Sequence, residues 1–119
     1  MKGWKGAVVA EGLSDPKVIN NFSVYKVVIT DENMLIDYEG NFGRWHIYWI
    51  RLSRKEIDDL QDYILRGWYA HFWDKNRIIV VYNYKQFELV RNDKNTWKEA
   101  IEHGKKQGIL ENELDFPTD

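Results

Sequence analysis

One carboxylate and two imidazoles, Glu11, His46 and His71, are the side chains of this sequence best suited to proton transfer. A carboxylate beside a histidine orients the imidazole and raises its pKa, which is the arrangement that acid–base catalysis requires. Tyr69 stands two residues before His71 and adds a phenol to the group. The three residues are far apart in the chain, so they form a catalytic site only if the fold brings them together. On that condition we name Glu11, His46 and His71 as candidate catalytic residues.

The same three residues allow two other interpretations. His46 and His71 can be ordinary strand residues, one bonded to the backbone and the other hydrated. Two histidines and a glutamate could also hold a metal ion with one open position, but the chain has no His-x-His or His-x-x-x-His pair to support it. The glycine-rich loops of nucleotide sites and the G-x-S-x-G motif of serine hydrolases are missing. We therefore predict neither a metal nor a cofactor.

A cluster of aromatic residues indicates binding. The run Gly67-Trp68-Tyr69-Ala70-His71-Phe72-Trp73 carries more aromatic surface than a short core strand usually needs. We expect part of it to line a pocket, and the candidate ligand-binding residues are Trp68, Tyr69, Trp73 and Trp45. A simpler interpretation stays open, in which Trp68, Phe72 and Trp49 belong to the core.

Length, composition and charge narrow the class of protein. The 119 residues suit a single domain, 1–119, that buries one core without disulfides or metal. Cysteine is absent, which excludes a disulfide framework and thiol catalysis and fits a cytoplasmic protein. No apolar run is long enough for a membrane span. The net charge of −2 argues against a broad phosphate-binding surface, so nucleic acid is an unlikely partner.

The residue pattern predicts an α+β protein. Strands are expected over 7–10, 24–30, 44–52, 69–73, 77–82 and 86–90. A short helix over 17–21 follows Asp15 as N-cap and Pro16 as first helical residue. Longer helices are expected over 54–66 and 97–107, each opened by a capping box (Ser53 with Glu56, Thr96 with Glu99) and stopped by a glycine (Gly67, Gly108). In segment 31–43, residues 34–36 can extend a strand and 37–43 form a loop.

The order of these elements predicts the topology. A βαββαβ series followed by ββα matches a ferredoxin-like core with an added β-hairpin and a C-terminal helix. Helix 54–66 would pack through an apolar stripe of Ile57, Leu60, Ile64 and Leu65. The first strand would lie between strands 44–52 and 69–73, antiparallel to both. That arrangement would bring Glu11, His46 and His71 to one end of the sheet.

Several motifs resemble those of a family of small prokaryotic proteins of unknown function. They are the segment 9–16, Trp45-His46, the aromatic run 67–73 and the tail 108–116, which together span nearly the whole chain. Such tails usually read Gly-Ile-Pro, and here Leu110 replaces the proline. The resemblance implies no activity, cofactor or catalytic residue.

These observations favour a ligand-binding or protein-interaction module with an aromatic-lined pocket. Its partner would be a small molecule or a protein, and a homodimer is one assembly left open. The first alternative is a small enzyme that uses the Glu/His acid–base site. The second is a nucleic-acid-binding sheet on which Trp45, Tyr48, Trp49 and Tyr69 stack bases, although the RNP1 motif is missing and the charge balance is acidic.

Overall fold

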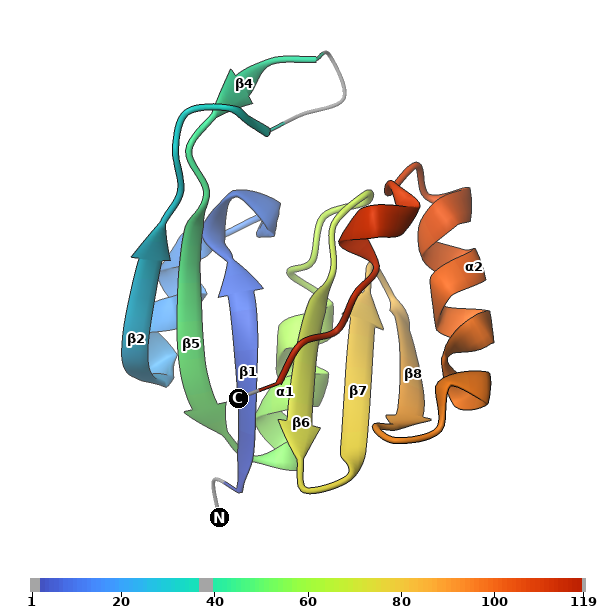
Figure 1. Cartoon of the computed structure of the whole chain (residues 1–119). Coiled ribbons are helices and arrows are strands. Elements are labelled where there is room, and N and C mark those ends of the chain that lie inside the picture. The colour runs from blue at the N-terminus through green and yellow to red at the C-terminus, as the bar shows by residue number, and fades with distance from the viewer. Residues whose placement is uncertain (1–2, 37–39, 119) are drawn as a thin grey trace.

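Six antiparallel strands form one sheet in the order β2-β5-β1-β6-β7-β8. The structure is a computed structural model and describes residues 3–36 and 40–118. The strands are β1 (Trp4–Val9), β2 (Ser23–Ile29), β5 (His46–Leu52), β6 (Ala70–Asp74), β7 (Arg77–Tyr82) and β8 (Lys85–Val90). A separate two-stranded hairpin, β3 (Met34–Leu35) with β4 (Phe42–Gly43), extends beyond one end of the sheet (Figure 1). Part of the loop predicted over 37–43, residues 37–39, lies outside the described residues.

Helices cover both faces of the sheet (Figure 1). They are the α-helices α1 (Arg54–Gln61) and α2 (Lys98–Lys106) and the 3-10 helices η1 (Ala10–Gly12), η2 (Pro16–Asn21), η3 (Lys94–Trp97) and η4 (Glu111–Glu113). The predicted short helix is thus η2, and the Asp15 carboxylate accepts a hydrogen bond from the Lys17 N–H as its N-cap. The α+β class and the antiparallel sheet are confirmed. In the described residues, no helix has the length and apolar character needed to cross a membrane.

Side-chain alternation in β5 divides the core into two clusters, one on each face of the sheet. Ile50 and Leu52 point to the face covered by α1 and η2 and are fully buried there. Trp49, of opposite parity, packs against the second cluster, which lies under α2 and the C-terminal tail. Strand β5 is therefore fully buried at Ile50 and Leu52 on the α1 side, whereas Ile47 and Trp49 on its other side are only half-buried.

The N-terminus of α1 is capped as predicted. The Ser53 hydroxyl accepts from the Glu56 N–H at 3.2 Å, and the Glu56 carboxylate accepts from the Ser53 N–H at 2.9 Å. Ile57 and Leu60 are buried in the first cluster, also as predicted.

The end of α1 differs from the prediction of a helix to residue 66. Residues 63–65 turn away to pair with η1 and its neighbours, since the Ser14 N–H donates to the Tyr63 carbonyl and the Leu65 N–H to the Gly12 carbonyl. Ile64 is still buried, but outside the helix, and Leu65 is 38% exposed. Leu65 therefore does not belong to the apolar stripe, because the chain is extended there and the helical spacing no longer applies.

The capping box predicted for the last helix was also wrong. Helix α2 begins at Lys98 with no side-chain cap, and the 3-10 helix η3 precedes it with Asp93 as N-cap. The Thr96 hydroxyl is used elsewhere, because it accepts from the Val90 N–H at 2.9 Å. Thr96 thus ties the helical segment to the end of β8.

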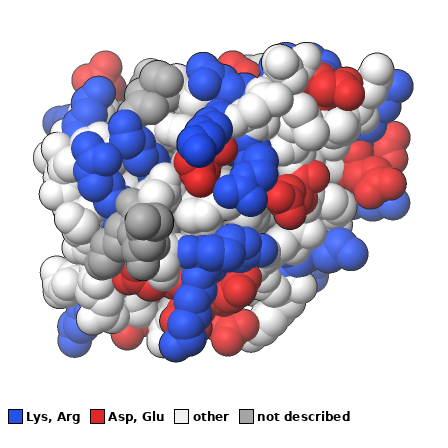
Figure 2. Space-filling model, turned by 90° about the horizontal axis from the view of Figure 1, so that it is seen from below, with Lys and Arg blue, Asp and Glu red and all other residues white. Residues whose placement is uncertain are grey.

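Charged residues are mixed at the end of the sheet that carries the N-terminus. Seen from that end, Lys and Arg side chains are frequent and Asp and Glu side chains lie between them (Figure 2). Some of these cations cover aromatic rings: the guanidinium of Arg77 lies 4.8 Å from the centre of the Trp4 ring, and that of Arg51 lies 4.7 Å from that of Tyr25. Trp4 is buried beneath its cation, whereas Tyr25 stays 37% exposed.

Truncation of Leu60 tests the packing of α1. Leu60→Ala should cost roughly 2–5 kcal/mol of unfolding free energy, because it leaves a cavity in a closed core. Urea unfolding monitored by circular dichroism measures the loss. Asp59→Ala, on the exposed side of the same turn, is the matched control and should change little. Equal, small losses for both variants would contradict the packing.

Replacement of Ser53 tests the cap. Ser53→Ala should destabilise by about 1 kcal/mol, whereas Ser53→Asp should be nearly neutral because its carboxylate also accepts from the Glu56 N–H. Thermal unfolding of the two variants beside the wild type gives the comparison. The same loss in both would show that the hydroxyl is not the cap.

Candidate functional site

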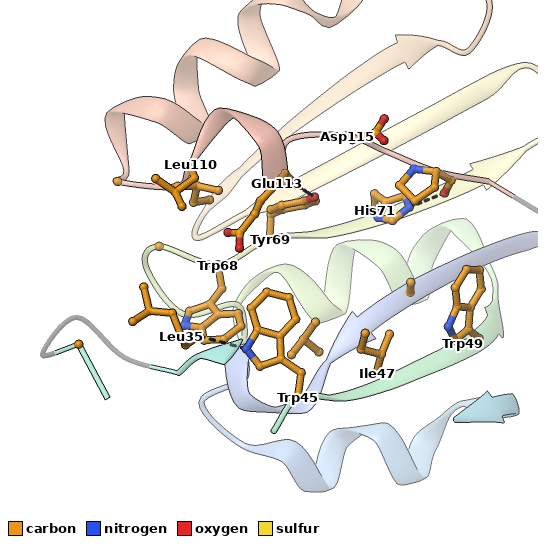
Figure 3. Close-up of a pocket in the computed structure, with 17 residues that line it drawn as sticks. Leu35, Trp45, Ile47, Trp49, Trp68, Tyr69, His71, Leu110, Glu113 and Asp115 are labelled. Atoms are coloured by element: carbon orange, nitrogen blue, oxygen red, sulfur yellow. Dashed lines mark hydrogen bonds between the residues drawn. The ribbon is translucent and has the colours of Figure 1, made fainter. Parts of the chain in front are cut away.

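A cavity of about 510 Å³ opens on the face of the sheet that α2 covers only in part. Helix α2 and the tail lie over β6, β7 and β8, and the hairpin β3–β4 stands beyond the end of the sheet where β5 begins (Figure 1). The space between them, above β1 and β5, has no helix over it. The cavity lies in this gap, and Figure 3 shows the residues that line it.

The floor of the cavity consists of small and aliphatic side chains. Ala7 stands in β1 between Trp49 of β5 and His71 of β6, its register partners on either side. Val9 and Ile47 form the next pair along the same face. Because Ala7 is short, the larger side chains on both sides stand above it and leave room between them. The cavity follows from this alternation of small and large residues.

Two tryptophans wall one end of the cavity. The Trp45 and Trp68 ring centres are 5.3 Å apart and their planes are inclined by 57°. The Trp45 indole N–H donates to the Leu35 carbonyl at 3.0 Å, which fixes that ring. Trp68 is held by close approach to η1, since a Cβ at Gly12 would lie 2.8 Å from the Trp68 ring. Both rings are therefore held in place before any ligand arrives.

The C-terminal tail forms the opposite wall. Tyr69 donates its hydroxyl hydrogen bond to the Glu113 carbonyl, and the His71 ring bonds the Pro117 carbonyl through Nε2 at 2.6 Å. A carbonyl only accepts, so Nε2 carries the hydrogen in this bond. The tail is also anchored by Leu114 and Phe116, both of which are buried.

Burial favours the uncharged forms of three side chains around the cavity. It lowers the pKa of His71 to about 4, against smaller raising effects of the Pro117 carbonyl and the Asp115 carboxylate. It also raises the pKa of the Tyr69 phenol and of the Glu113 carboxyl above their ordinary values. His71 is therefore a neutral donor to the tail at neutral pH and a weak base.

The structure brings Glu11 and His46 together but not His71. The Glu11 carboxylate accepts from the His46 backbone N–H and lies against His46 Nδ1, both at 2.7 Å. His46 shares the parity of Tyr48 and Ile50, which face α1, whereas His71 faces the cavity. The predicted group of three is therefore wrong, because the alternation of strand residues puts the two imidazoles on opposite faces. Neither Glu11 nor His46 lines the cavity.

The four predicted ligand-binding residues divide in a similar way. Trp45, Trp68 and Tyr69 line the cavity. Trp73 does not, because it is buried in the second cluster with its ring edge-on to Trp49 at 5.6 Å.

Sequence reasoning missed the floor and the tail wall. The alternation of residues in strand 44–52 places Ile47 and Trp49 on one face. Pairing of this strand with the short residue Ala7 would have indicated the floor. The tail wall had a weaker signal, the apolar residues Leu114 and Phe116 within an acidic segment. The missed lining residues with side chains are Leu35, Ala7, Val9, Ile47, Trp49, Ile109, Leu110, Glu113, Asp115 and Pro117.

No metal site is visible in the part of the chain that the structure describes, where no three His, Asp or Glu side chains are grouped to hold an ion. Comparisons with models of protein families, with curated proteins and with solved structures found no match. The geometry of the cavity is therefore the basis for a functional proposal.

The buried His71 predicts a pH dependence of stability. The pKa of His71 is about 4 in the folded chain and near 6.5 in the unfolded chain. Between about pH 4 and pH 6.5 the unfolded state therefore binds more protons than the folded state. The contribution of neutral His71 is complete above about pH 6.5 and is lost as the pH falls toward 4, by up to about 1.4 kcal/mol per pH unit. Urea unfolding between about pH 6.5 and 5 measures this slope.

His71→Asn should reduce the slope, because that site then takes up no proton in either state. His103→Asn is the matched control: His103 is only half-buried, and the variant should remove a smaller part of the slope. An equal effect of the two variants would contradict a special role of His71.

Proposed function

We propose that this protein binds a small, mainly apolar molecule in the cavity between β1, β5 and the C-terminal tail. The observation that carries the proposal is a cavity of about 510 Å³ lined mainly by aromatic and aliphatic side chains. Ligand sites in proteins have roughly 300–1,000 Å³ and the same mixture of apolar walls with a few polar groups. The walls are fixed by hydrogen bonds and close packing, so little ordering is needed on binding.

One polar group in the wall supports the proposal. The Trp49 indole N–H is buried and has no hydrogen-bond partner among the described residues. A buried donor without an acceptor costs about 1–3 kcal/mol. A hydroxyl, carbonyl or ether oxygen of a ligand over the cavity floor would satisfy this donor and orient the molecule.

Binding of a protein is the second candidate, and β2 is the observation that favours it. This edge strand exposes apolar side chains, with Val27 48% and Ile29 57% exposed. Exposed apolar edge strands pair with other chains, and a second copy could pair there to form a homodimer. The cavity needs no partner chain, so the small molecule remains the first candidate.

The two alternatives have less support. An acid–base enzyme would need Glu11 and His46 at the cavity, and they lie outside its lining. His71 does line it, but its hydrogen is bonded to Pro117 and it is a weak base. A nucleic-acid-binding sheet would need exposed aromatic residues rimmed by cations, whereas the described charged residues that line the cavity around Trp45, Trp49 and Tyr69 are Glu113 and Asp115.

We also propose a ferredoxin-like core for the fold. It would comprise β1, η2, β2, β5, α1 and β6, with the hairpin β7–β8 and helix α2 added. The neighbour order β2-β5-β1-β6 and the antiparallel pairing of β1 with both β5 and β6 support this assignment. Membership of the family of small prokaryotic proteins that the sequence resembles rests on its motifs alone.

Ligand binding to the wild type and to a variant whose cavity is filled by a larger side chain tests the proposal. A panel of small aromatic compounds, neutral and charged, should include some that raise the melting temperature of the wild type, because a ligand of the folded state stabilises it. Ala7→Leu places a larger side chain on the floor and should abolish these shifts. Val24→Leu, on the edge strand outside the cavity, is the matched control and should retain them. A panel without any shift, or shifts that survive Ala7→Leu, would sink the proposal.

A further inference from the structure

The end of the cavity between Trp45 and Trp68 differs from its apolar floor. Two indole rings inclined by 57° stand there, with Tyr69 beside them, and the Trp45 N–H is already occupied by the Leu35 carbonyl. The faces of these rings carry the negative part of the aromatic quadrupole. Such faces attract cations, most strongly where water is excluded.

A carboxylate lies at the same end. The Glu113 side chain extends from η4 toward Trp68 and Trp45 (Figure 3). Within the described residues it forms no hydrogen bond or ion pair, since the bond from Tyr69 is made to the Glu113 backbone carbonyl. Glu113 is exposed at the rim of the cavity, and the burial of part of its side chain raises the pKa of the carboxyl. A cation placed against the rings would stabilise this charge.

The remaining charges of the cavity have the same sign. Asp115 lines it further along the tail, and the described lining residues include no Lys or Arg. Lys26 lies outside the lining, with its ammonium 5.1 Å from the centre of the Trp49 ring at the floor end. An anionic group would therefore find a cation only at that end and would meet the Glu113 carboxylate at the two-tryptophan end. A neutral ligand would leave the Glu113 carboxylate without a partner. At the two-tryptophan end, the Glu113 carboxylate and the indole faces therefore favour a cation.

We propose that the ligand is a methylated ammonium compound, with its cationic head against the Trp45–Trp68 pair on the side of Glu113 and its apolar body over Ala7 and Ile47. This inference rests on the proposed function and specifies the class of ligand. A primary ammonium has three N–H donors and needs as many acceptors, whereas this end of the cavity offers one free carboxylate. Methyl groups remove those donors and weaken hydration, so a tertiary or quaternary ammonium fits the rings better.

The opposite end of the ligand meets the Trp49 N–H. This buried donor stands on the floor beyond Ile47, away from the two-tryptophan wall (Figure 3). An oxygen acceptor on the apolar body would satisfy it. The expected ligand thus carries a methylated ammonium at one end and an oxygen at the other.

Two compounds of the same shape test the charge. They are meta-hydroxyphenyl-trimethylammonium and meta-tert-butylphenol, which differ by a positively charged nitrogen in place of a carbon. Titration calorimetry on the wild type should find the ammonium at least about tenfold tighter, the discrimination expected of a desolvated cation–π site backed by a carboxylate. Glu113→Gln should reduce that ratio severalfold and Trp68→Leu should reduce it further. Glu111→Gln is the matched control and should leave the ratio unchanged, because Glu111 lies outside the cavity lining and is paired with Lys105.

The outcomes distinguish failure of the methylated ammonium ligand from failure of the apolar binding cavity itself. Equal affinities of the two compounds for the wild type would overturn the inference and leave an apolar binding site standing. A preference for the ammonium that survives both Glu113→Gln and Trp68→Leu would place the cation elsewhere and overturn it as well. The melting temperatures of the variants show whether they are folded, and Ala7→Leu should abolish binding of both compounds. Binding that persists in Ala7→Leu would contradict the cavity itself.

Discussion

Burial of Leu114 and Phe116 in the second hydrophobic cluster is the contact on which the site depends. These side chains hold the C-terminal tail against β6, and the Phe116 ring lies edge-on to Tyr69 at 5.5 Å. Gly104 of α2 allows the tail to approach, because a Cβ there would lie 2.5 Å from Leu114. Only with the tail in this place can Tyr69 and His71 reach its carbonyls. The cavity is therefore a product of helix, strand and tail packing together.

The same packing explains why the cavity does not close. Helix α2 has nine residues and packs through Ala100 and Gly104, so it covers the β7–β8 side of the sheet and ends there. The tail beyond η4 crosses β7 and β6 without forming a helix (Figure 1), so the space over Ala7 in β1 is left to the cavity. A cavity of this kind costs packing energy, since its walls lack contacts that a filled core would have. A ligand that supplies these contacts would offset the cost.

The parts of the structure that follow local rules could be predicted from the sequence. The Ser53 cap, the Asp15 cap and the two faces of β5 depend on residues a few positions apart. The end of α1 could not, because it is set by pairing between residues 63–65 and residues 12–14, far away in the chain. Thr96 was misjudged for the same reason: its hydroxyl bonds the Val90 N–H at the end of β8 rather than its own helix.

The candidate site was harder to predict from the sequence than the fold. Trp45, Trp68 and Tyr69 could be named from aromatic content alone, but the separation of His46 from His71 depends on strand parity and register. The Glu11–His46 pair is better read as a clip, since both carboxylate oxygens are used to hold η1 against the start of β5. That clip lies next to Trp45 in the chain. It thereby supports a wall of the cavity without lining it.

Burial gives the cavity a specific electrostatic character. It lowers the pKa of His71 and raises the pKa of the Glu113 carboxyl. The two residues respond differently to a cationic ligand. A positive charge near Glu113 favours the ionised carboxylate and lowers its pKa, whereas the same charge further disfavours protonation of His71. Binding of an ammonium and release of a proton from Glu113 are then linked, and affinity falls as the solution becomes acidic enough to protonate that carboxylate.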